Sequence, residues 1–331
     1  MSKPIIDSFG RVHTNLRISV TDRCNIRCFY CMPENVEFLQ QSRILTFEEI
    51  ARFVSVVARS GVNKLRLTGG EPLVRRDLPA LVKMLAAIKG IEDIALTTNG
   101  LLLAKHAQSL RKAGLNRLNI SLDTLDEDVF EQISRRKGLQ KVLDGIEVAN
   151  GAGFDKIRLN AIAIKGLTEN EIIPLVRFAI SKQLELRFIE FMPLDAEQNW
   201  ENDQVLTGQK LRAIIEDEFG TLVAANRPDS SQPAIDYTLK NGVGKIGFIN
   251  PVSEPFCNSC NRLRITAEGK IRNCLFSSEE FDVMSLLRSA TATDSEIEKV
   301  VRDCVLEKKA AHGIDSTSFN RPEKAMYQIG G

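Results

Sequence analysis

The feature that most constrains this chain is a run of short β-rich segments that alternate with amphipathic helical segments, from residue 16 to about residue 192. Strand patterns cover residues 16–20, 64–69, 93–98, 117–123, 157–164 and 184–192. Apolar residues recur at helical spacing in residues 47–60, 77–89, 102–113, 139–150 and 170–181. Strands that are joined through crossover helices form a parallel sheet. Six such units without a glycine-rich dinucleotide turn favour an α/β fold built as an incomplete (β/α)6 TIM-type barrel.

The pattern changes after about residue 195. A helix is predicted near residues 207–218, short strands near 235–240, 245–250 and 261–266, and helical segments within 278–307. We therefore expect two domains, residues 1–218 as the barrel and residues 219–331 as a smaller α+β C-terminal domain. The last residues, 321–331, have no recognisable apolar face.

The overall charge is close to balanced, with 44 Lys and Arg against 43 Asp and Glu. A balanced chain has no global field that attracts nucleic acid or an anionic membrane. No apolar run approaches the ~18 residues of a membrane helix, and the first residues do not resemble a signal peptide. We expect a cytoplasmic protein, whose cysteines bind metal before they form disulfides. Cys304 stands alone and is predicted to be a buried thiol.

Six of the seven cysteines fall into two triplets. One has the spacing C-x3-C-x2-C directly after the first predicted strand, and the other has the spacing C-x2-C-x13-C in the second half of the chain. Three thiolates can hold three irons of a 4Fe-4S cluster and leave the fourth iron open to a small molecule. The alternative is structural zinc, with His312 or Cys304 completing the second site. The spacing favours two clusters, and the predicted ligands are Cys24, Cys28, Cys31, Cys257, Cys260 and Cys274.

Polar and glycine residues gather where the predicted strands end. They include Gly69 to Glu71, Thr97 to Asn99, Ser121 with Asp123, and Met192. Ligands of parallel β/α folds bind at this carboxyl edge of the sheet.

Four arginines are positioned to bind an anion. Alternation along a strand puts Arg262 and Arg264 on one face, beside the second cysteine triplet. Together with Arg17 and Arg66 on the first two strands, they predict a site for a phosphate-sized anion, since guanidinium groups bind phosphate well.

The first cysteine triplet, with the aromatic Tyr30 before its last cysteine, resembles the radical S-adenosylmethionine superfamily, and residues 69–72 match the GGEP motif of that superfamily. The resemblance implies that the open iron binds the amino and carboxylate groups of S-adenosylmethionine. The implied contacts of this cofactor are Tyr30, Gly70, Glu71, Ser121 and Met192.

Seven segments together resemble the family of GTP 3',8-cyclases, which act first in molybdenum cofactor biosynthesis. They are CNIRCFYC, TGGEPL, TTNG, SLD, RFIEFMP, CNSCNRLR and the terminal Gly330-Gly331. The resemblance implies a GTP site made by Arg17, Arg66, Thr97, Arg158, Arg262 and Arg264, of which Arg158 replaces the lysine usual in the family. It also implies catalytic roles for Arg17, Arg262, Arg264 and the two terminal glycines.

The same resemblance implies a reaction and partners. A 5'-deoxyadenosyl radical would convert GTP to 3',8-cyclo-7,8-dihydro-GTP with the help of an external electron donor. A downstream cyclic pyranopterin monophosphate synthase and a homodimer are also implied. Two other readings stay open, a radical enzyme that modifies a peptide and a non-catalytic iron-sulfur sensor. Against these, the Arg-x-Arg strand favours a nucleotide, and a sensor needs no S-adenosylmethionine site.

Overall fold

The computed structural model describes residues 3–195, 197–227, 229–314, 316 and 319–330. In these residues one twelve-stranded sheet has the order β12-β11-β10-β1-β2-β3-β4-β5-β6-β9-β8-β7. Its six consecutive parallel strands are those expected from the sequence, with ends shifted by at most a few residues. They are β1 (Asn15–Ser19), β2 (Lys64–Thr68), β3 (Asp93–Thr98), β4 (Arg117–Ser121), β5 (Lys156–Ala163) and β6 (Glu185–Glu190).

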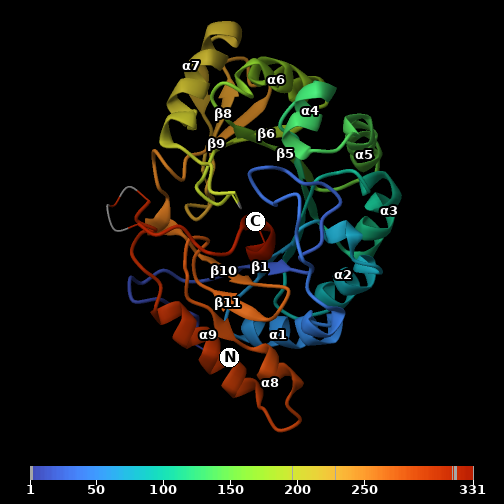
Figure 1. Cartoon of the computed structure of the whole chain (residues 1–331), viewed down its shortest axis with the longest axis vertical. Coiled ribbons are helices and arrows are strands. Elements are labelled where there is room, and N and C mark those ends of the chain that lie inside the picture. Colours follow the sequence, from blue (N-terminus) through green and yellow to red (C-terminus); the bar gives the residue numbers. More distant parts are fainter. Residues whose placement is uncertain (1–2, 196, 228, 315, 317–318, 331) are drawn as a thin grey trace.

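Helices follow these strands and lie outside the curved sheet, as Figure 1 shows. They are α1 (Phe47–Arg59), α2 (Leu78–Ala86), α3 (Leu103–Ala113), α4 (Glu127–Ser134), α5 (Leu139–Gly151) and α6 (Ile172–Ser181). The start of α1 is fixed by a capping box, in which Thr46 Oγ1 accepts from the Glu49 N–H and the Glu49 carboxylate accepts from the Thr46 N–H. Helix α4 was not expected, because its eight residues are too few for a clear period.

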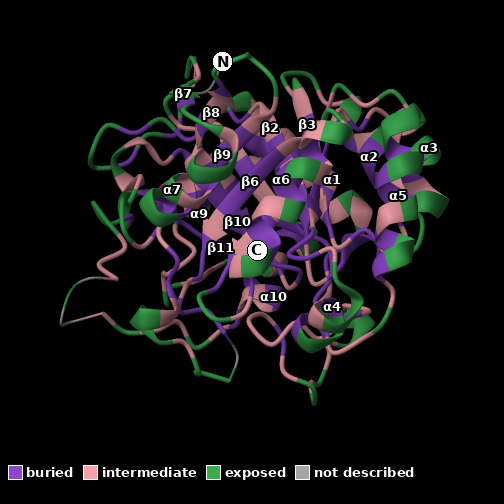
Figure 2. Ribbon diagram, turned by 90° about the horizontal axis from the view of Figure 1, so that it is seen from above, coloured by how far each residue is buried: buried purple, intermediate pink, exposed green. Residues whose placement is uncertain are grey.

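The main core lies between the sheet and this outer layer of helices. Leu65 and Leu67 of β2, Leu96 of β3, and Phe53 and Val54 of α1 are among its buried members. Figure 2 shows the strands buried at the centre and the exposed residues on the outer sides of the helices.

The strands after residue 219 continue the central sheet at both of its edges. On one side β9 (Lys245–Ile249) pairs parallel with β6, and β8 (Ile235–Leu239) and β7 (Leu222–Ala224) follow antiparallel. On the other side β10 (Arg262–Ile265) pairs parallel with β1, followed by β11 (Lys270–Arg272) and β12 (Phe281–Asp282). These additions pair backbone groups that β1 and β6 would otherwise leave open as edge strands.

The remaining helices are α7 (Gly208–Phe219), α8 (Met284–Arg288), α9 (Asp294–Leu306) and α10 (Met326–Ile329). The expectation that the tail has no core face is wrong. Tyr327 and Ile329 of α10 are buried, and Tyr327 packs in a small cluster with Met32, beside Cys24 and Cys31. A helix of four residues is too short to show a helical period, so its core face cannot be predicted from the sequence pattern. In Figure 1 the C-terminal end lies inside the ring formed by the sheet.

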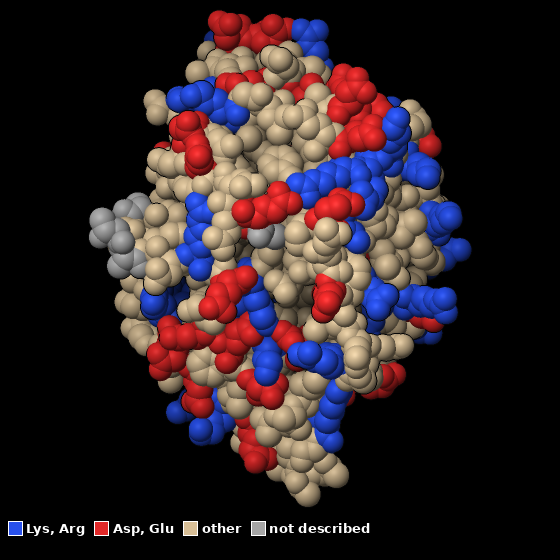
Figure 3. Space-filling model, viewed as in Figure 1, with Lys and Arg blue, Asp and Glu red and all other residues tan. Residues whose placement is uncertain are grey.

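Charged side chains of both signs are interspersed over the face drawn in Figure 3. Within the described residues, every helix is too short or too polar to cross a bilayer.

Candidate active site

A cavity of about 590 Å³ extends along the inner face of the central strands, from first residues such as Asn15 and Lys64 to carboxyl-end residues such as Thr68 and Ser121. Both cysteine triplets line it, although more than 220 residues separate them in sequence. The predicted contacts of S-adenosylmethionine and GTP line the same cavity: Tyr30, Gly70, Glu71, Ser121, Met192, Arg17, Arg66, Thr97, Arg158, Arg262 and Arg264. The fold therefore brings together residues that the sequence grouped only by motif.

The first cysteine loop is anchored to the end of α4. The backbone N–H of Arg27 donates to the Ser134 carbonyl over 2.8 Å, and that of Phe29 donates to the Ile133 carbonyl over 3.1 Å. Because α4 is not predicted from the sequence, its contact with the first cysteine loop is not predicted either.

The two glycines of the GGEP motif let its backbone approach the loop that leads to Cys24. A Cβ on Gly70 would lie 2.4 Å from the Arg23 carbonyl oxygen, and one on Gly69 would lie 2.5 Å from the Thr21 carbonyl oxygen. The Gly70 N–H donates to that Thr21 oxygen over 2.8 Å. Close contact between two backbones therefore already requires glycine here.

The carboxylate of Glu71 is bound by donors from the protein itself. It accepts from the Leu73 N–H (3.0 Å), the Thr98 hydroxyl (2.8 Å) and the Asn99 N–H (2.7 Å). Burial raises the pKa of Glu71 to about 7, although these bonds act in the opposite direction. Glu71 thus ties the motif to the end of β3, and its contact with S-adenosylmethionine stays a prediction.

Tyr30, which is half-buried, and Asp123, which is buried, form a hydrogen-bonded pair in the cavity wall. The Tyr30 hydroxyl donates to Asp123 Oδ2 over 2.7 Å, and the Ile162 N–H donates to Oδ1 over 2.8 Å. Burial raises the pKa of Asp123 to about 6. From the sequence, Asp123 is recognisable only as a polar residue at a strand end, with no predicted role.

Asn99 was likewise noted only as a polar residue at a strand end. Its Nδ2 donates to Asn25 Oδ1 over 2.8 Å and lies 3.8 Å from Cys24 Sγ. Asn99 is therefore a direct neighbour of the first cysteine triplet.

Three arginines form a row across neighbouring parallel strands. Arg264 of β10 is the register partner of Arg17 of β1, which is in turn the register partner of Arg66 of β2. Register partners point to the same face of a sheet, and this face lines the cavity. Burial and the charges of Arg264 and Arg262 hold the pKa of Arg17 well below its usual range. Burial and the charge of Arg17 do the same to the pKa of Arg66.

Like charges gather here without carboxylates to offset them. Among the described residues, no Asp or Glu forms an ion pair with Arg17, Arg66, Arg262 or Arg264. Other arginines of the cavity wall are paired, as Arg117 is with Asp93. Grouped cations that are buried or half-buried in a cavity wall and have no carboxylate partners indicate a site for a polyanion.

Thr97 and Arg158 differ in how free they are to bind a ligand. The Thr97 hydroxyl is buried and has no hydrogen-bond partner among the described residues. Arg158 Nε, in contrast, donates to Glu185 over 2.6 Å. Thr97 thus offers an unsatisfied polar group to a ligand, whereas part of Arg158 is already engaged.

The second cysteine triplet lies between β9 and the end of β11. Cys257 and Cys260 belong to one tight turn, and the Cys260 N–H donates to the Cys257 carbonyl over 3.1 Å. Arg262 Nε donates to Cys260 Sγ over 3.3 Å, and Lys308 Nζ lies 3.6 Å from the same sulfur. Burial raises the pKa of the Cys260 thiol, but the charges of Arg262 and Lys308 outweigh it and lower the pKa to about 6.

The two triplets fit clusters better than single ions. Within the part of the chain that the structure describes, no three Cys, His, Asp or Glu side chains converge closely enough to hold one metal ion. In a cube-shaped cluster each cysteine binds a different iron, so the sulfurs stand farther apart than around one zinc ion. Cys304 is buried in the main core, as expected, and takes no part in the cavity wall.

The end of the chain reaches the arginine row. The Gly330 carbonyl accepts a hydrogen bond from Arg264 Nη1. Gly330 has φ +80°, and a Cβ there would lie 2.6 Å from Thr68 Oγ1. Gly331, the other residue of the predicted catalytic tail, lies outside the described residues.

Two family models match most of the chain. The model described as Radical SAM superfamily matches residues 18–179, and the model described as Molybdenum Cofactor Synthesis C matches residues 184–314. The first segment contains the first cysteine triplet and the second segment contains the other.

Close relatives cover the whole chain. A GTP 3',8-cyclase of Rhodopirellula baltica is 54% identical over 337 residues, which cover 100% of this chain and 94% of that protein. A GTP 3',8-cyclase of Streptomyces coelicolor is 40% identical over 329 residues, with coverage of 99% and 96%. The crystal structure of Streptococcus suis SuiB bound to S-adenosylmethionine has a TM-score of 0.63 at 17% identity, over 92% of this chain and 69% of that one. The SuiB structure supports the α/β fold alone.

Proposed function

The chain belongs to the GTP 3',8-cyclase family, and on that premise we propose that its cavity converts GTP to 3',8-cyclo-7,8-dihydro-GTP, the first step of molybdenum cofactor biosynthesis. Two 4Fe-4S clusters and S-adenosylmethionine are the cofactors of this reaction. The cysteines available in the cavity match this requirement, with three thiols for each cluster.

One observation carries the assignment of GTP. Arg264, Arg17 and Arg66 stand in register on three adjacent strands without carboxylate partners among the described residues. A triphosphate supplies the negative charge that this row lacks, and guanidinium forks bind phosphate oxygens in pairs. We assign Arg262 and Arg158 to the same site, together with the unsatisfied hydroxyl of Thr97.

The cofactors are assigned to opposite sides of the GTP site. Cys24, Cys28 and Cys31 would hold the cluster that binds S-adenosylmethionine, with Tyr30, Gly70, Glu71, Ser121 and Met192 around it. Cys257, Cys260 and Cys274 would hold the second cluster, next to the guanine base. When bound and reduced, the first cluster together with S-adenosylmethionine would supply a 5'-deoxyadenosyl radical, which is the species that could take the hydrogen from C3' of GTP.

The residues of the chain orient GTP and exclude water from the cavity. The arginines bind the triphosphate, which is remote from the reacting carbons, so their binding energy fixes the position of the ribose without touching it. The tail, with Tyr327 packed beside the first triplet and Gly330 bonded to Arg264, narrows the cavity and excludes water. We assign a catalytic role to Gly330 on this basis, and to Gly331, which lies outside the described residues, from family membership alone.

Several finer assignments complete the proposal. We interpret β1 to β6 and their helices as an incomplete (β/α)6 barrel, and residues 219–331 as a C-terminal domain that carries the second cluster. An external electron donor, a cytoplasmic location, a homodimer and delivery of the product to a cyclic pyranopterin monophosphate synthase follow from family membership alone.

The test is anaerobic turnover. The protein is reconstituted with iron and sulfide, reduced with dithionite, and supplied with S-adenosylmethionine and GTP, ATP or no nucleotide. Mass spectrometry after chromatographic separation should find 5'-deoxyadenosine together with a nucleotide of the same mass as GTP but a different retention time, with GTP only. The masses are equal because the hydrogen lost from C3' to 5'-deoxyadenosine is replaced by one electron from the reductant and one proton. Deoxyadenosine without consumption of any nucleotide would reject GTP in favour of another substrate, such as a peptide.

A further inference from the structure

Lys308 is a buried cation that the proposed reaction does not use. It follows α9, and only 5% of its surface is exposed. Its ammonium group donates to the Arg262 carbonyl over 3.0 Å and points at Cys260 Sγ from 3.6 Å. None of the carboxylates in the described residues forms an ion pair with it. A buried charge without a counter-ion costs free energy. Negative charge on Cys260 Sγ would offset this cost.

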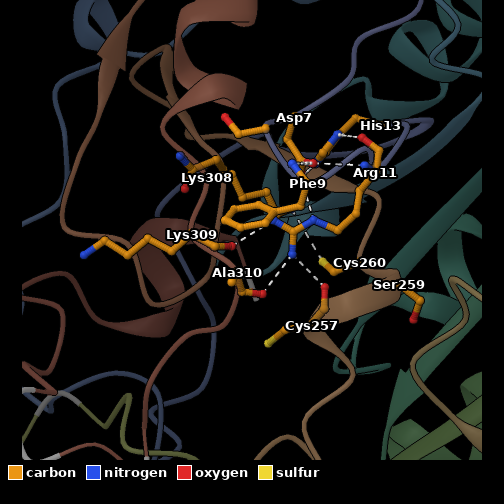
Figure 4. A network of polar contacts seen from close by, with 12 residues as sticks. Asp7, Phe9, Arg11, His13, Cys257, Ser259, Cys260, Lys308, Lys309 and Ala310 are labelled. Carbon is orange, nitrogen blue, oxygen red and sulfur yellow. Dashed lines mark hydrogen bonds and ion pairs between the residues drawn. The ribbon is translucent and has the colours of Figure 1, made fainter.

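A second cation holds the segment after Lys308 against the cysteine turn. Arg11 donates through Nη1 to the carbonyls of Cys257 (2.8 Å) and Ala310 (3.0 Å), and through Nη2 to the carbonyl of Lys309 (2.8 Å). Its Nε donates to Asp7 Oδ2 over 2.5 Å. Figure 4 shows the Arg11 guanidinium between these carbonyls, with the Lys309 side chain directed away from them.

This arrangement fixes the backbone on both sides of the ammonium group. Arg11 connects the turn of Cys257 to residues 309 and 310, the two residues that follow Lys308 in the chain. The Arg11 side chain is itself fixed by Asp7. This aspartate is buried, and its Oδ1 also accepts from the Arg11 N–H. Lys308 is therefore held next to Cys260 rather than resting there by chance.

We propose that Lys308 is a positioning residue of the second cluster, whose hydrogen bond to Cys260 stabilises the reduced, more negative state of that cluster and raises its reduction potential. This rests on the proposed function, in which the second triplet holds a 4Fe-4S cluster. Hydrogen bonds and positive charge at a ligand sulfur favour added negative charge on the cluster. Arg262 also reaches Cys260, but it is assigned to GTP, whereas Lys308 serves the cluster with or without substrate.

The experiment is an anaerobic redox titration followed by electron paramagnetic resonance. Reconstituted wild type is compared with Lys308→Gln, Lys308→Arg and the matched control Lys309→Gln, which removes an exposed charge one residue away. A background with Cys24→Ala and Cys28→Ala identifies the signal of the second cluster. In the proteins that keep Cys24 and Cys28, the first cluster serves as the internal reference.

We expect Lys308→Gln to lower the midpoint potential of the second cluster only. Lys308→Arg, which keeps the positive charge, should change this potential much less. Loss of the second cluster from folded Lys308→Gln but not from Lys308→Arg would support the same role. An unchanged potential in Lys308→Gln, an equal shift in Lys309→Gln, or loss of the cluster from both Lys308 variants would overturn it. If wild type itself shows only the first cluster, the proposed function fails, and this outcome is distinguishable by iron analysis before any variant is made.

Discussion

Arg17 of β1 and Arg66 of β2 are register partners on adjacent parallel strands, so their guanidinium groups face the same cavity. Burial and the charge of Arg17 hold the pKa of Arg66 below its usual range, and burial with the charges of Arg264 and Arg262 does the same to the pKa of Arg17. Such a pair is unfavourable until an anion lies between its members. Binding of a polyanion and stability of the ligand-free protein should therefore change in opposite directions when one arginine is removed.

We predict that Arg66→Ala weakens GTP binding and stabilises the ligand-free protein. A hydrogen bond to a charged group contributes about 1.5–3 kcal/mol, so the dissociation constant should rise on the order of 10- to 100-fold. Loss of the repulsion from Arg17 should raise the free energy of unfolding. Equilibrium dialysis with GTP and urea denaturation measure the two effects. Arg177→Ala, which removes an exposed arginine paired with Glu218, is the control and should leave GTP binding unchanged.

Gly70→Ala should abolish binding of the first cluster and spare the second. A Cβ at this position meets the Arg23 carbonyl oxygen at 2.4 Å, so the loop that carries Cys24 must move. Iron content and electron paramagnetic resonance after reconstitution measure the loss. Gly151→Ala adds the same methyl group where nothing lies within 4 Å and should bind both clusters. Full occupancy of the first cluster in Gly70→Ala would contradict the role of this contact.

Asp123→Asn should remove part of the pH dependence of stability in the cluster-free protein. The folded pKa of Asp123 is about 6, above its ordinary value of 3.8. Between these values the folded state holds a proton that the unfolded state has lost, so the free energy of unfolding falls as pH rises, by about 3 kcal/mol. An amide stays neutral, and it can accept from the Ile162 N–H and donate to the Tyr30 oxygen. Urea denaturation between pH 4 and pH 6.5 should show a shallower decline for Asp123→Asn, and equal slopes would refute this explanation.

Gly330→Ala should release the tail from the cavity. The residue has φ +80°, and the added Cβ would lie 2.6 Å from Thr68 Oγ1. Strain of about 1–3 kcal/mol corresponds to a shift in tail occupancy on the order of tenfold or more. Turnover should fall, and proteolysis near residue 326 should become faster. The double variant Gly330→Ala with Thr68→Ala removes the closest contact, so it should recover part of the turnover and part of the resistance to proteolysis. Unchanged turnover in Gly330→Ala would show that the tail is dispensable.

The sequence predicts the six central strands well because each is a short β-rich run between helical segments. It also predicts which residues share the cavity, since strand ends of a parallel sheet meet at one edge. It could not show that β9 and β10 join the two edges of that sheet, because strand pairing across more than 50 residues leaves no local pattern. Nor did it reveal that Tyr327 packs beside the first triplet, since α10 is only one helical turn.

The motifs also do not show which partners their residues have in the folded protein. Glu71 was expected to face S-adenosylmethionine, and its carboxylate is bound by three donors of the protein. Arg158 was grouped with the GTP ligands, yet its Nε already pairs with Glu185. Lys308 and Arg11 lie outside every motif. Their relation to the second triplet depends on contacts across 48 residues for Lys308 and across more than 240 residues for Arg11.

The most direct test of the account is the fate of the hydrogen on C3' of GTP. Reconstituted, reduced protein is given S-adenosylmethionine and GTP deuterated at C3', and the 5'-deoxyadenosine formed is analysed by mass spectrometry. The account predicts deuterium in the deoxyadenosine in proportion to the cyclised nucleotide. Unlabelled deoxyadenosine alongside intact GTP would contradict it, because the cavity would then generate the radical without presenting the ribose of GTP to it.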